Sequence, residues 1–205
     1  MTAVYVCALP REISGETEAR LMSGLPVYRR EKAEKYMRGS DRALSAAAWR
    51  LMRLAVREAA GLDGFALTVL TDGLRKPYFA GCAGVHFNVS HCGNAVACAV
   101  SESPCGVDIE PLMAADAEIA RRVMPSICGE LAAMADGAER DGFYTRGWTE
   151  TESVYKSGAA AGGGLREGYD VSRFRSGGYY IALCAKTRGA QARLIEIEFD
   201  RLITD

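Results

Sequence analysis

Two short stretches decide the fold of this chain: VHFNVSH at Val85–His91 and PCGVDIE at Pro104–Glu110. Apolar and β-branched residues predict strands at Val85–Ser90, Ala95–Val100 and Cys105–Glu110, with Gly, Asn, Ser and Pro between them. Three short strands in a row indicate a sheet that is mostly antiparallel.

Outward from these stretches, strand and helix patterns occur on both sides. A helical pattern runs over 29–60 with a break at Gly39-Ser40, and Gly61 stops it. The end of the chain predicts two strands paired with each other after a turn at 176–178, and 159–164 is predicted to be a small loop. The other predicted elements are strands at 3–9, 65–70, 179–183 and 192–199 and helices at 114–124 and 142–157. This order predicts an α+β fold.

The composition is that of an ordinary globular protein. The chain has 205 residues, of which 49% are apolar and 25% charged, and its net charge is −1. This balance excludes a fibrous or disordered chain and general electrostatic attraction to nucleic acids or acidic membranes. Anion binding must therefore depend on local clusters of Lys and Arg.

The cysteines and the N-terminus indicate the compartment. Seven cysteines are scattered without a C-x-x-C motif, which favours free thiols over disulfides or a structural zinc site. Residues 1–7 lack the pattern of a signal peptide, and no apolar run has the length of a transmembrane helix. We therefore expect a cytoplasmic protein that does not bind membranes.

Two acids of the second stretch point to a metal. Asp108 and Glu110 are two residues apart in a predicted strand, so their side chains share a face. Two carboxylates aimed at one place repel each other unless a cation lies between them, and Mg²⁺ prefers such oxygens together with phosphate oxygens of a substrate. The alternative is an exposed strand end with two solvated acids.

A third stretch, WTETESVYK at Trp148–Lys156, supplies an acid and a cation in a predicted helix. Glu152 and Lys156 are four residues apart and share a helix face. They form either a surface ion pair worth about 0.3–0.5 kcal/mol or a pair in which Glu152 faces a metal and Lys156 a phosphate. His91 follows Ser90 at a strand end beside a glycine, where backbone amides and a hydroxyl favour an anion.

These three stretches together resemble the phosphopantetheinyl transferases of the long, surfactin-synthetase-activating (Sfp-like) type. The segment FNVSHCG at 87–93 is followed by GVDIE at 106–110 and by W-T-x-x-E-S-x-x-K at 148–156, in the order and near the spacing of that family. Lys76-Pro77-Tyr78 and the basic region 29–42 resemble further segments of the family. The likeness covers residues from about 29 to 165.

The resemblance implies a fold and an activity. The fold is a monomer of two similar α+β halves, a pseudo-dimer in which each half is a small, mostly antiparallel sheet packed against a long helix. We expect residues 1–102 and 103–205 to form these halves, with coenzyme A in the cleft between them. The implied activity transfers the phosphopantetheine arm of coenzyme A to a serine of an apo acyl or peptidyl carrier protein and releases adenosine 3′,5′-bisphosphate.

The resemblance also implies roles for individual residues. Mg²⁺, or Mn²⁺ in its place, lies between the carboxylates of Asp108, Glu110 and Glu152, and Glu152 is the proposed base for the carrier serine. The catalytic set is Glu152, His91 and Lys156. The residues implied to contact coenzyme A are Arg29, Lys32, Arg42, Lys76, Ser90, His91 and Lys156.

Three departures from the family pattern leave a second interpretation open. Thr151 stands where the family usually has a lysine, Cys92 stands where a serine is common, and residues 159–164 lengthen a loop. The loss of a phosphate contact at Thr151 corresponds to about 1–3 kcal/mol. The alternative function is therefore a non-catalytic module that binds coenzyme A or a carrier protein. A basic-helix nucleic-acid binder is disfavoured because Glu31 and Glu34 interrupt the basic run.

Overall fold

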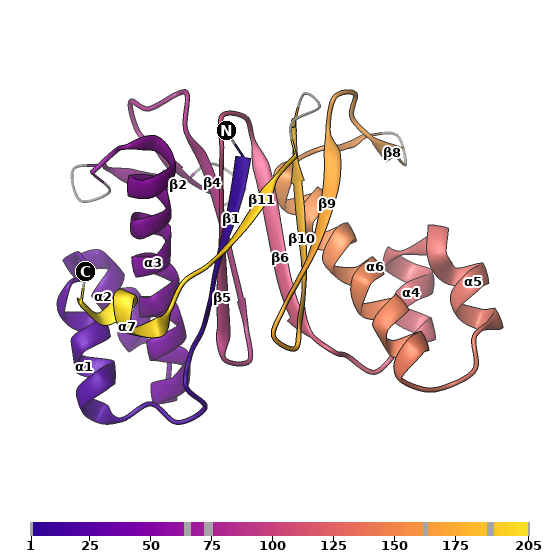
Figure 1. The fold of residues 1–205 in the computed structure, drawn as a ribbon, viewed down its shortest axis with the longest axis horizontal. Helices are drawn as coiled ribbons and strands as arrows, with labels where there is room; N and C mark the ends of the chain where they lie inside the picture. The colour runs from indigo at the N-terminus through magenta and orange to yellow at the C-terminus, as the bar shows by residue number, and fades with distance from the viewer. Residues whose placement is uncertain (1, 64–66, 72–75, 162–163, 188–190, 205) are drawn as a thin grey trace.

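Two β-sheets lie face to face between two long helices, α3 (Gly39–Ala60) and α6 (Ala138–Ser157), so the layers run helix, sheet, sheet, helix (Figure 1). The computed structural model describes residues 2–63, 67–71, 76–161, 164–187 and 191–204. The predicted α+β class is confirmed. No helix within these ranges combines the length and the apolar character that crossing a membrane requires.

The first sheet has the strand order β11-β1-β5-β4. All its pairs are antiparallel except β1 with β11, which run parallel. Alternate residues of β1 face opposite ways: Tyr5 lies in the core against α3, whereas Val4 and Val6 lie in the core between the sheets. Burial on both faces explains the continuous apolar run that the sequence shows here. The strands are β1 (Thr2–Ala8), β4 (His86–Cys92), β5 (Ala95–Ser101) and β11 (Arg193–Glu196).

The second sheet has the order β6-β10-β9 and is antiparallel throughout. Val107 and Ile109 of β6 enter the core between the sheets, so the intervening Gly106, Asp108 and Glu110 lie on the face that α6 covers. The strands are β6 (Cys105–Pro111), β9 (Asp170–Ser176) and β10 (Tyr179–Ala185).

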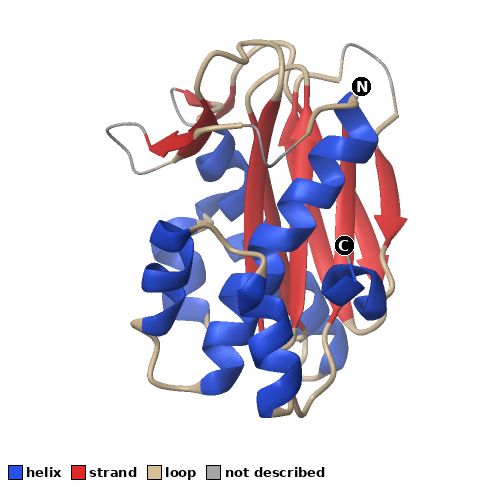
Figure 2. Ribbon diagram, turned by 90° about the vertical axis from the view of Figure 1, so that its left-hand side faces the viewer, coloured by secondary structure: helices blue, strands red, loops and turns tan. Residues whose placement is uncertain are grey.

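The remaining helices flank the layers on both sides. Viewed from the side of α1, α2 and α3, the helices stand in front of the strands (Figure 2). The long helices α3 and α6 are followed by Gly61 and Gly158, whose positive φ of 65° and 74° suits glycine. The other elements are α1 (Gly15–Ser23), α2 (Val27–Glu34), β2 (Val69–Thr71), β3 (Pro77–Phe79), α4 (Ala117–Val123), the 3₁₀ turn η1 (Pro125–Ile127), α5 (Cys128–Ala133), β7 (Ala160–Ala161), β8 (Gly164–Leu165) and α7 (Phe199–Thr204).

The pairing predicted for the last strands is wrong. The turn at 176–178 joins β9 to β10, whereas β11 lies beside β1 in the first sheet. Alternating apolar residues show that a segment is a strand but not which sheet edge it joins, because any apolar edge satisfies the pattern. The strand β9 and the helix α1 were not predicted.

Three further predictions concern a strand, a loop and the division of the chain into halves. Residues 65–66 of the strand predicted at 65–70 lie outside the described residues, and β2 begins at Val69. The loop predicted at 159–164 contains the short paired strands β7 and β8, with 162–163 outside the described residues. The division into 1–102 and 103–205 stays a prediction, while β11 and α7 pack with the first sheet and α3.

Candidate active site

The carboxylate of Asp108 is the centre of the candidate site. Its side chain is 2% exposed, and its Oδ1 accepts hydrogen bonds from Lys156 Nζ at 2.5 Å and Ser90 Oγ at 2.9 Å. Lys156 Nζ also lies 3.2 Å from Ser90 Oγ. The other oxygen, Oδ2, is buried and has no hydrogen-bond partner within the described chain. A buried oxygen of an acid is costly to leave unpaired, and a cation or a hydrogen-bond donor would satisfy it.

Gly106 brings the two elements of this site together. A Cβ atom built on Gly106 would lie 2.1 Å from Ser153 O and 2.4 Å from Ser157 N, both backbone atoms of α6. Only glycine permits so close an approach of strand and helix. Because of it, Lys156 in the last turn of α6 reaches Asp108, two residues beyond Gly106 on β6.

Glu110 extends the negative side of the site. Partial burial of its carboxyl group, followed by repulsion from Asp108 and, more weakly, from Glu152, raises the pKa of Glu110 from 4.5 to about 7. The charge of Lys156 and a hydrogen bond with the Cys92 thiol oppose this shift. Burial and the negative charges of Glu110 and Asp108 raise the pKa of Cys92, so its thiol stays protonated.

Glu110 thus interacts electrostatically with both of the other predicted metal ligands, Asp108 and Glu152. Among the described residues, no group of three or more His, Cys, Asp or Glu side chains lies close enough to hold a metal ion. The chemistry of the donors nevertheless fits a hard divalent cation, because all three are carboxylates and Asp108 Oδ2 is buried and unpaired. The pKa of Glu110 is raised mainly by burial, and repulsion from Asp108 and Glu152 adds to this.

A hollow of about 300 Å³ collects several of the predicted anion-binding residues. Arg29, Lys32 and His91 all line it. The guanidinium of Arg29 lies 4.8 Å from the ring centroid of Trp49, and its buried Nε has no hydrogen-bond partner in the described chain. Burial and the positive charge of Lys156 lower the pKa of His91. The hollow thus combines cations with an aromatic wall, which suits a nucleotide phosphate and its base.

Two predicted residues have other partners. Arg42 pairs with Glu18 at 2.5 Å and also donates to the carbonyls of Tyr36 and Met37. Lys76 Nζ donates to the carbonyls of Cys105 at 2.9 Å and Lys156 at 2.7 Å, so it ties β6 to the end of α6. Neither residue lines the hollow.

The aromatic wall of the hollow was not predicted from the sequence. Trp49 and Tyr28 line the hollow and contact each other edge to face, with ring centroids 5.8 Å apart. Trp49 lies one helical turn after Ser45, which lies 3.5 Å from Arg29. The available signal was an aromatic residue in a helix beside a basic segment, but that signal depends on knowing that α2 packs on α3.

Sequence comparison places the chain among known enzymes. It is 31% identical over 163 residues to a 4′-phosphopantetheinyl transferase of Bacillus subtilis, covering 79% of this chain and 71% of the relative. It is 29% identical over 154 residues to the 4′-phosphopantetheinyl transferase Sfp of Bacillus subtilis (strain 168), covering 75% and 68%. A third relative, 4′-phosphopantetheinyl transferase ffp of Bacillus subtilis, is 28% identical over 154 residues, with coverage of 75% and 68%. No protein-family model matches the chain.

These relatives define the class, a transferase of phosphopantetheine. The chain belongs to the 4′-phosphopantetheinyl transferase family, and its resemblance to the Sfp-like type is confirmed.

Proposed function

We propose that this protein transfers the 4′-phosphopantetheine arm of coenzyme A to a serine of an apo acyl or peptidyl carrier protein. The serine oxygen forms a bond to the phosphorus that carries the pantetheine arm. The bond from that phosphorus to the bridging oxygen breaks, and adenosine 3′,5′-bisphosphate leaves. The observation that carries the proposal is the buried Asp108, which pairs with Lys156 through Oδ1 and keeps Oδ2 unpaired within the described chain.

We propose Asp108, Glu110 and Glu152 as the residues that hold Mg²⁺, or Mn²⁺ in its place. The bound ion would neutralise the pyrophosphate of coenzyme A. The support is that the negative charges of Asp108 and Glu152 contribute to the raised pKa of Glu110, and that Asp108 has a buried oxygen without a hydrogen-bond partner in the described chain. Binding the ion requires the side chains to close from the arrangement in this structure, because no set of three acids is yet in place among the described residues.

The residues of the chain then divide the remaining work. Lys156 and His91 would bind the phosphates, and neutral His91, with its lowered pKa, would donate a hydrogen bond. Glu152 would accept the proton of the serine hydroxyl. Catalysis is mostly positioning and charge neutralisation, since the attacked phosphorus is surrounded by oxygens that repel the nucleophile.

The nucleotide end of coenzyme A would occupy the hollow beside Trp49. Arg29 and Lys32 line that hollow, and the buried Nε of Arg29 has a hydrogen to donate. Arg42, Lys76 and Ser90 contact protein groups in this structure, which supports a positioning role with phosphate contact only after rearrangement. Those protein contacts are with Glu18, the carbonyl of Lys156 and the carboxylate of Asp108.

We further propose that stretches 1–102 and 103–205 form the halves of a cytoplasmic monomer and that coenzyme A lies between them. The support is that the candidate site takes Ser90 and His91 from the first stretch and Asp108 and Lys156 from the second. The net charge of −1 gives no support to a nucleic-acid partner.

A panel of apo carrier proteins tests the transfer. Incubation with coenzyme A and Mg²⁺ should add the mass of one phosphopantetheine group to a carrier, on the serine that peptide mapping identifies. Calorimetric titration with coenzyme A is run in parallel. Tight binding of coenzyme A with no mass gain on any carrier would contradict the transfer and support the alternative, a non-catalytic binding module.

Thr151 is the observation that favours this alternative. Its hydroxyl donates to the carbonyl of Gly147 at 2.8 Å, so the position directly before Glu152 supplies no positive charge. A Thr151→Lys variant that gains transfer activity absent from the wild type would identify a decayed enzyme.

A further inference from the structure

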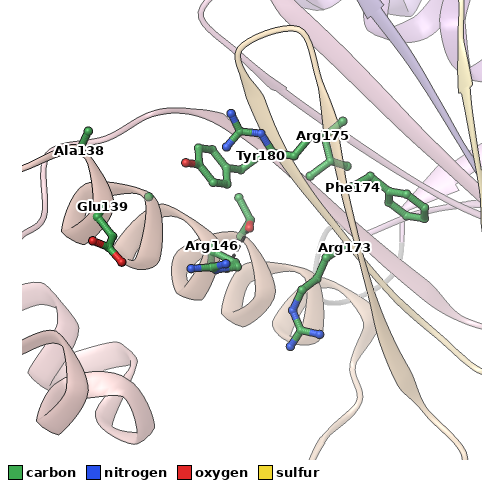
Figure 3. A pocket seen from close by; sticks show the side chains of 10 residues that line it. Ala138, Glu139, Arg146, Arg173, Phe174, Arg175 and Tyr180 are labelled. Atoms are coloured by element: carbon green, nitrogen blue, oxygen red, sulfur yellow. Dashed lines mark hydrogen bonds between the residues drawn. The ribbon is translucent and has the colours of Figure 1, made fainter. Parts of the chain in front are cut away.

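A second hollow, of about 440 Å³, lies between α6 and the strands β9 and β10 (Figure 3). Its volume falls in the range typical of small-molecule sites. Basic, aromatic and apolar residues share its wall with one threonine and one acid. They are Ala138, Glu139, Gly142, Arg146, Thr149, Arg173, Phe174, Arg175, Tyr180 and Ile181.

Three arginines line this hollow, and two of them form no ion pair within the described chain. Arg173 is committed, because it makes a two-point pair with Glu150 at 2.5 and 2.9 Å. Arg146 and Arg175 form no ion pair with any carboxylate of the described chain. Both side chains are exposed, so they are accessible to an anion from solution.

The arginine on β9 is also held in position. The guanidinium of Arg175 lies 3.5 Å from the ring centroid of Tyr180, and the two side chains are neighbours in Figure 3. Stacking on a ring orients a guanidinium while leaving its N–H groups free for a planar oxyanion. A fixed donor loses less conformational entropy on binding than a free one does.

The wall also has an apolar part. A Cβ on Gly142 would lie 2.6 Å from the hydroxyl oxygen of Tyr180, so glycine lets the ring lie against α6. Gly142 and the ring of Tyr180 form this apolar part next to the two guanidinium groups, while the side chain of Ile181 lies in the core between the sheets. This combination suits a ligand with a flat apolar body and one anionic group.

The second hollow is separate from the candidate active site. A helix turns by about 100° per residue, so Arg146 and Glu152 lie about 120° apart around α6. Thr149 and Ser153, which are buried against the sheet, lie between these two directions. The helix is thus a shared wall, with the candidate catalytic acid on one flank and the second hollow on the other.

We propose that this second hollow binds a small organic oxyanion, an aryl carboxylate or aryl phosphate. The inference does not depend on the proposed transfer, because none of the candidate catalytic or metal-binding residues lines this hollow. Glu139 opposes such a ligand, since it adds negative charge to the wall.

Titrations followed by ¹H–¹⁵N NMR test the site, with phenyl phosphate and benzoate as separate probes. Saturable shifts are expected at the amides of Gly142 and Tyr180, and the probe that binds more tightly identifies the oxyanion. Inorganic phosphate lacks the aromatic ring and benzyl alcohol lacks the anionic group, so both should bind more weakly. Equal binding of benzyl alcohol would overturn the proposal.

Variants separate this site from other anion-binding groups. Arg146→Gln and Arg175→Gln should each weaken binding on the order of tenfold, the usual effect of one charge-assisted hydrogen bond. Glu139→Gln should tighten binding about twofold to threefold, because it removes a negative charge from the wall. A folding defect would weaken binding instead. Arg122→Gln, in α4 and outside the hollow, is the matched control and should bind as the wild type does. Shifts that persist unchanged in both arginine variants would overturn the proposal, as would the absence of any saturable shift.

Discussion

Replacing Gly106 with alanine should damage stability and activity together. The new Cβ would lie 2.1 Å from Ser153 O and 2.4 Å from Ser157 N, more than an ångström short of ordinary contact with the first of these atoms. Both atoms belong to the backbone of α6, so no rotamer change relieves the clash and the helix must move. Overpacking of this kind costs about 1–3 kcal/mol, and we expect about 3 kcal/mol because backbone has to shift.

The shift also affects the candidate site. Lys156 in the last turn of α6 reaches Asp108 only because the helix approaches β6 so closely. Urea unfolding should show a lower midpoint with an unchanged slope, and transfer to a carrier protein should fall tenfold or more. Ser153→Ala should not rescue the variant, since the clash is with the carbonyl of Ser153 and not with its side chain.

A glycine elsewhere in the chain provides the control. A Cβ on Gly129 in α5 meets no atom within 4 Å, so Gly129→Ala should leave stability unchanged or raise it by up to about 1 kcal/mol. Wild-type stability and activity in Gly106→Ala would refute the role given to this close approach.

Three other predictions concern the charges of the site. Without metal, the pKa of Glu110 is about 7 in the folded protein, against 4.5 for an ordinary glutamate. Between these two pH values the folded state binds more protons than the unfolded state does. The free energy of unfolding should therefore fall as the pH rises through this range. The urea midpoint should be lower at about pH 8 than at about pH 5 in the wild type, and the difference should be smaller in Glu110→Gln. The same difference in both proteins would contradict this prediction. Lys156→Met should destabilise by about 2–3 kcal/mol, since it leaves the buried Asp108 without its cation, and adding Asp108→Asn should recover most of the loss in thermal unfolding; additive losses would argue against the pair. Thr151→Lys should tighten coenzyme A binding about tenfold by calorimetry; unchanged affinity would show that this position does not face a phosphate.

The parts of the site set by local geometry could be predicted from the sequence. Asp108 and Glu110 share a face because strands alternate, and Glu152 and Lys156 share a face because helices repeat. The pairing of Lys156 with Asp108 could not be predicted, because it depends on how closely α6 approaches β6. Gly106 permits that approach, but glycines in strands also occur at bulges and tight bends, so the residue type alone does not predict a helix packed against it.

Features that depend on tertiary contacts were not predictable. Arg42 is a residue type that often binds phosphate, but α1 places Glu18 beside it and the two form an ion pair. The strand β11 has an ordinary alternating pattern, and only the uncovered edge of β1 determines where it pairs. The wall made by Trp49 exists because α2 packs on α3, which no local pattern specifies.

The proposed transfer depends on the carboxylates of Asp108, Glu110 and Glu152, and one comparison tests both the reaction and the role of an acid. It is the intact mass of an apo carrier protein after incubation with coenzyme A, Mg²⁺ and either the wild type or Glu152→Gln. We expect a gain of one phosphopantetheine group with the wild type and a gain at least about a hundredfold slower with the variant, whose coenzyme A binding should persist. Equal rates for both proteins, or no gain with the wild type on any carrier, would contradict the proposed function.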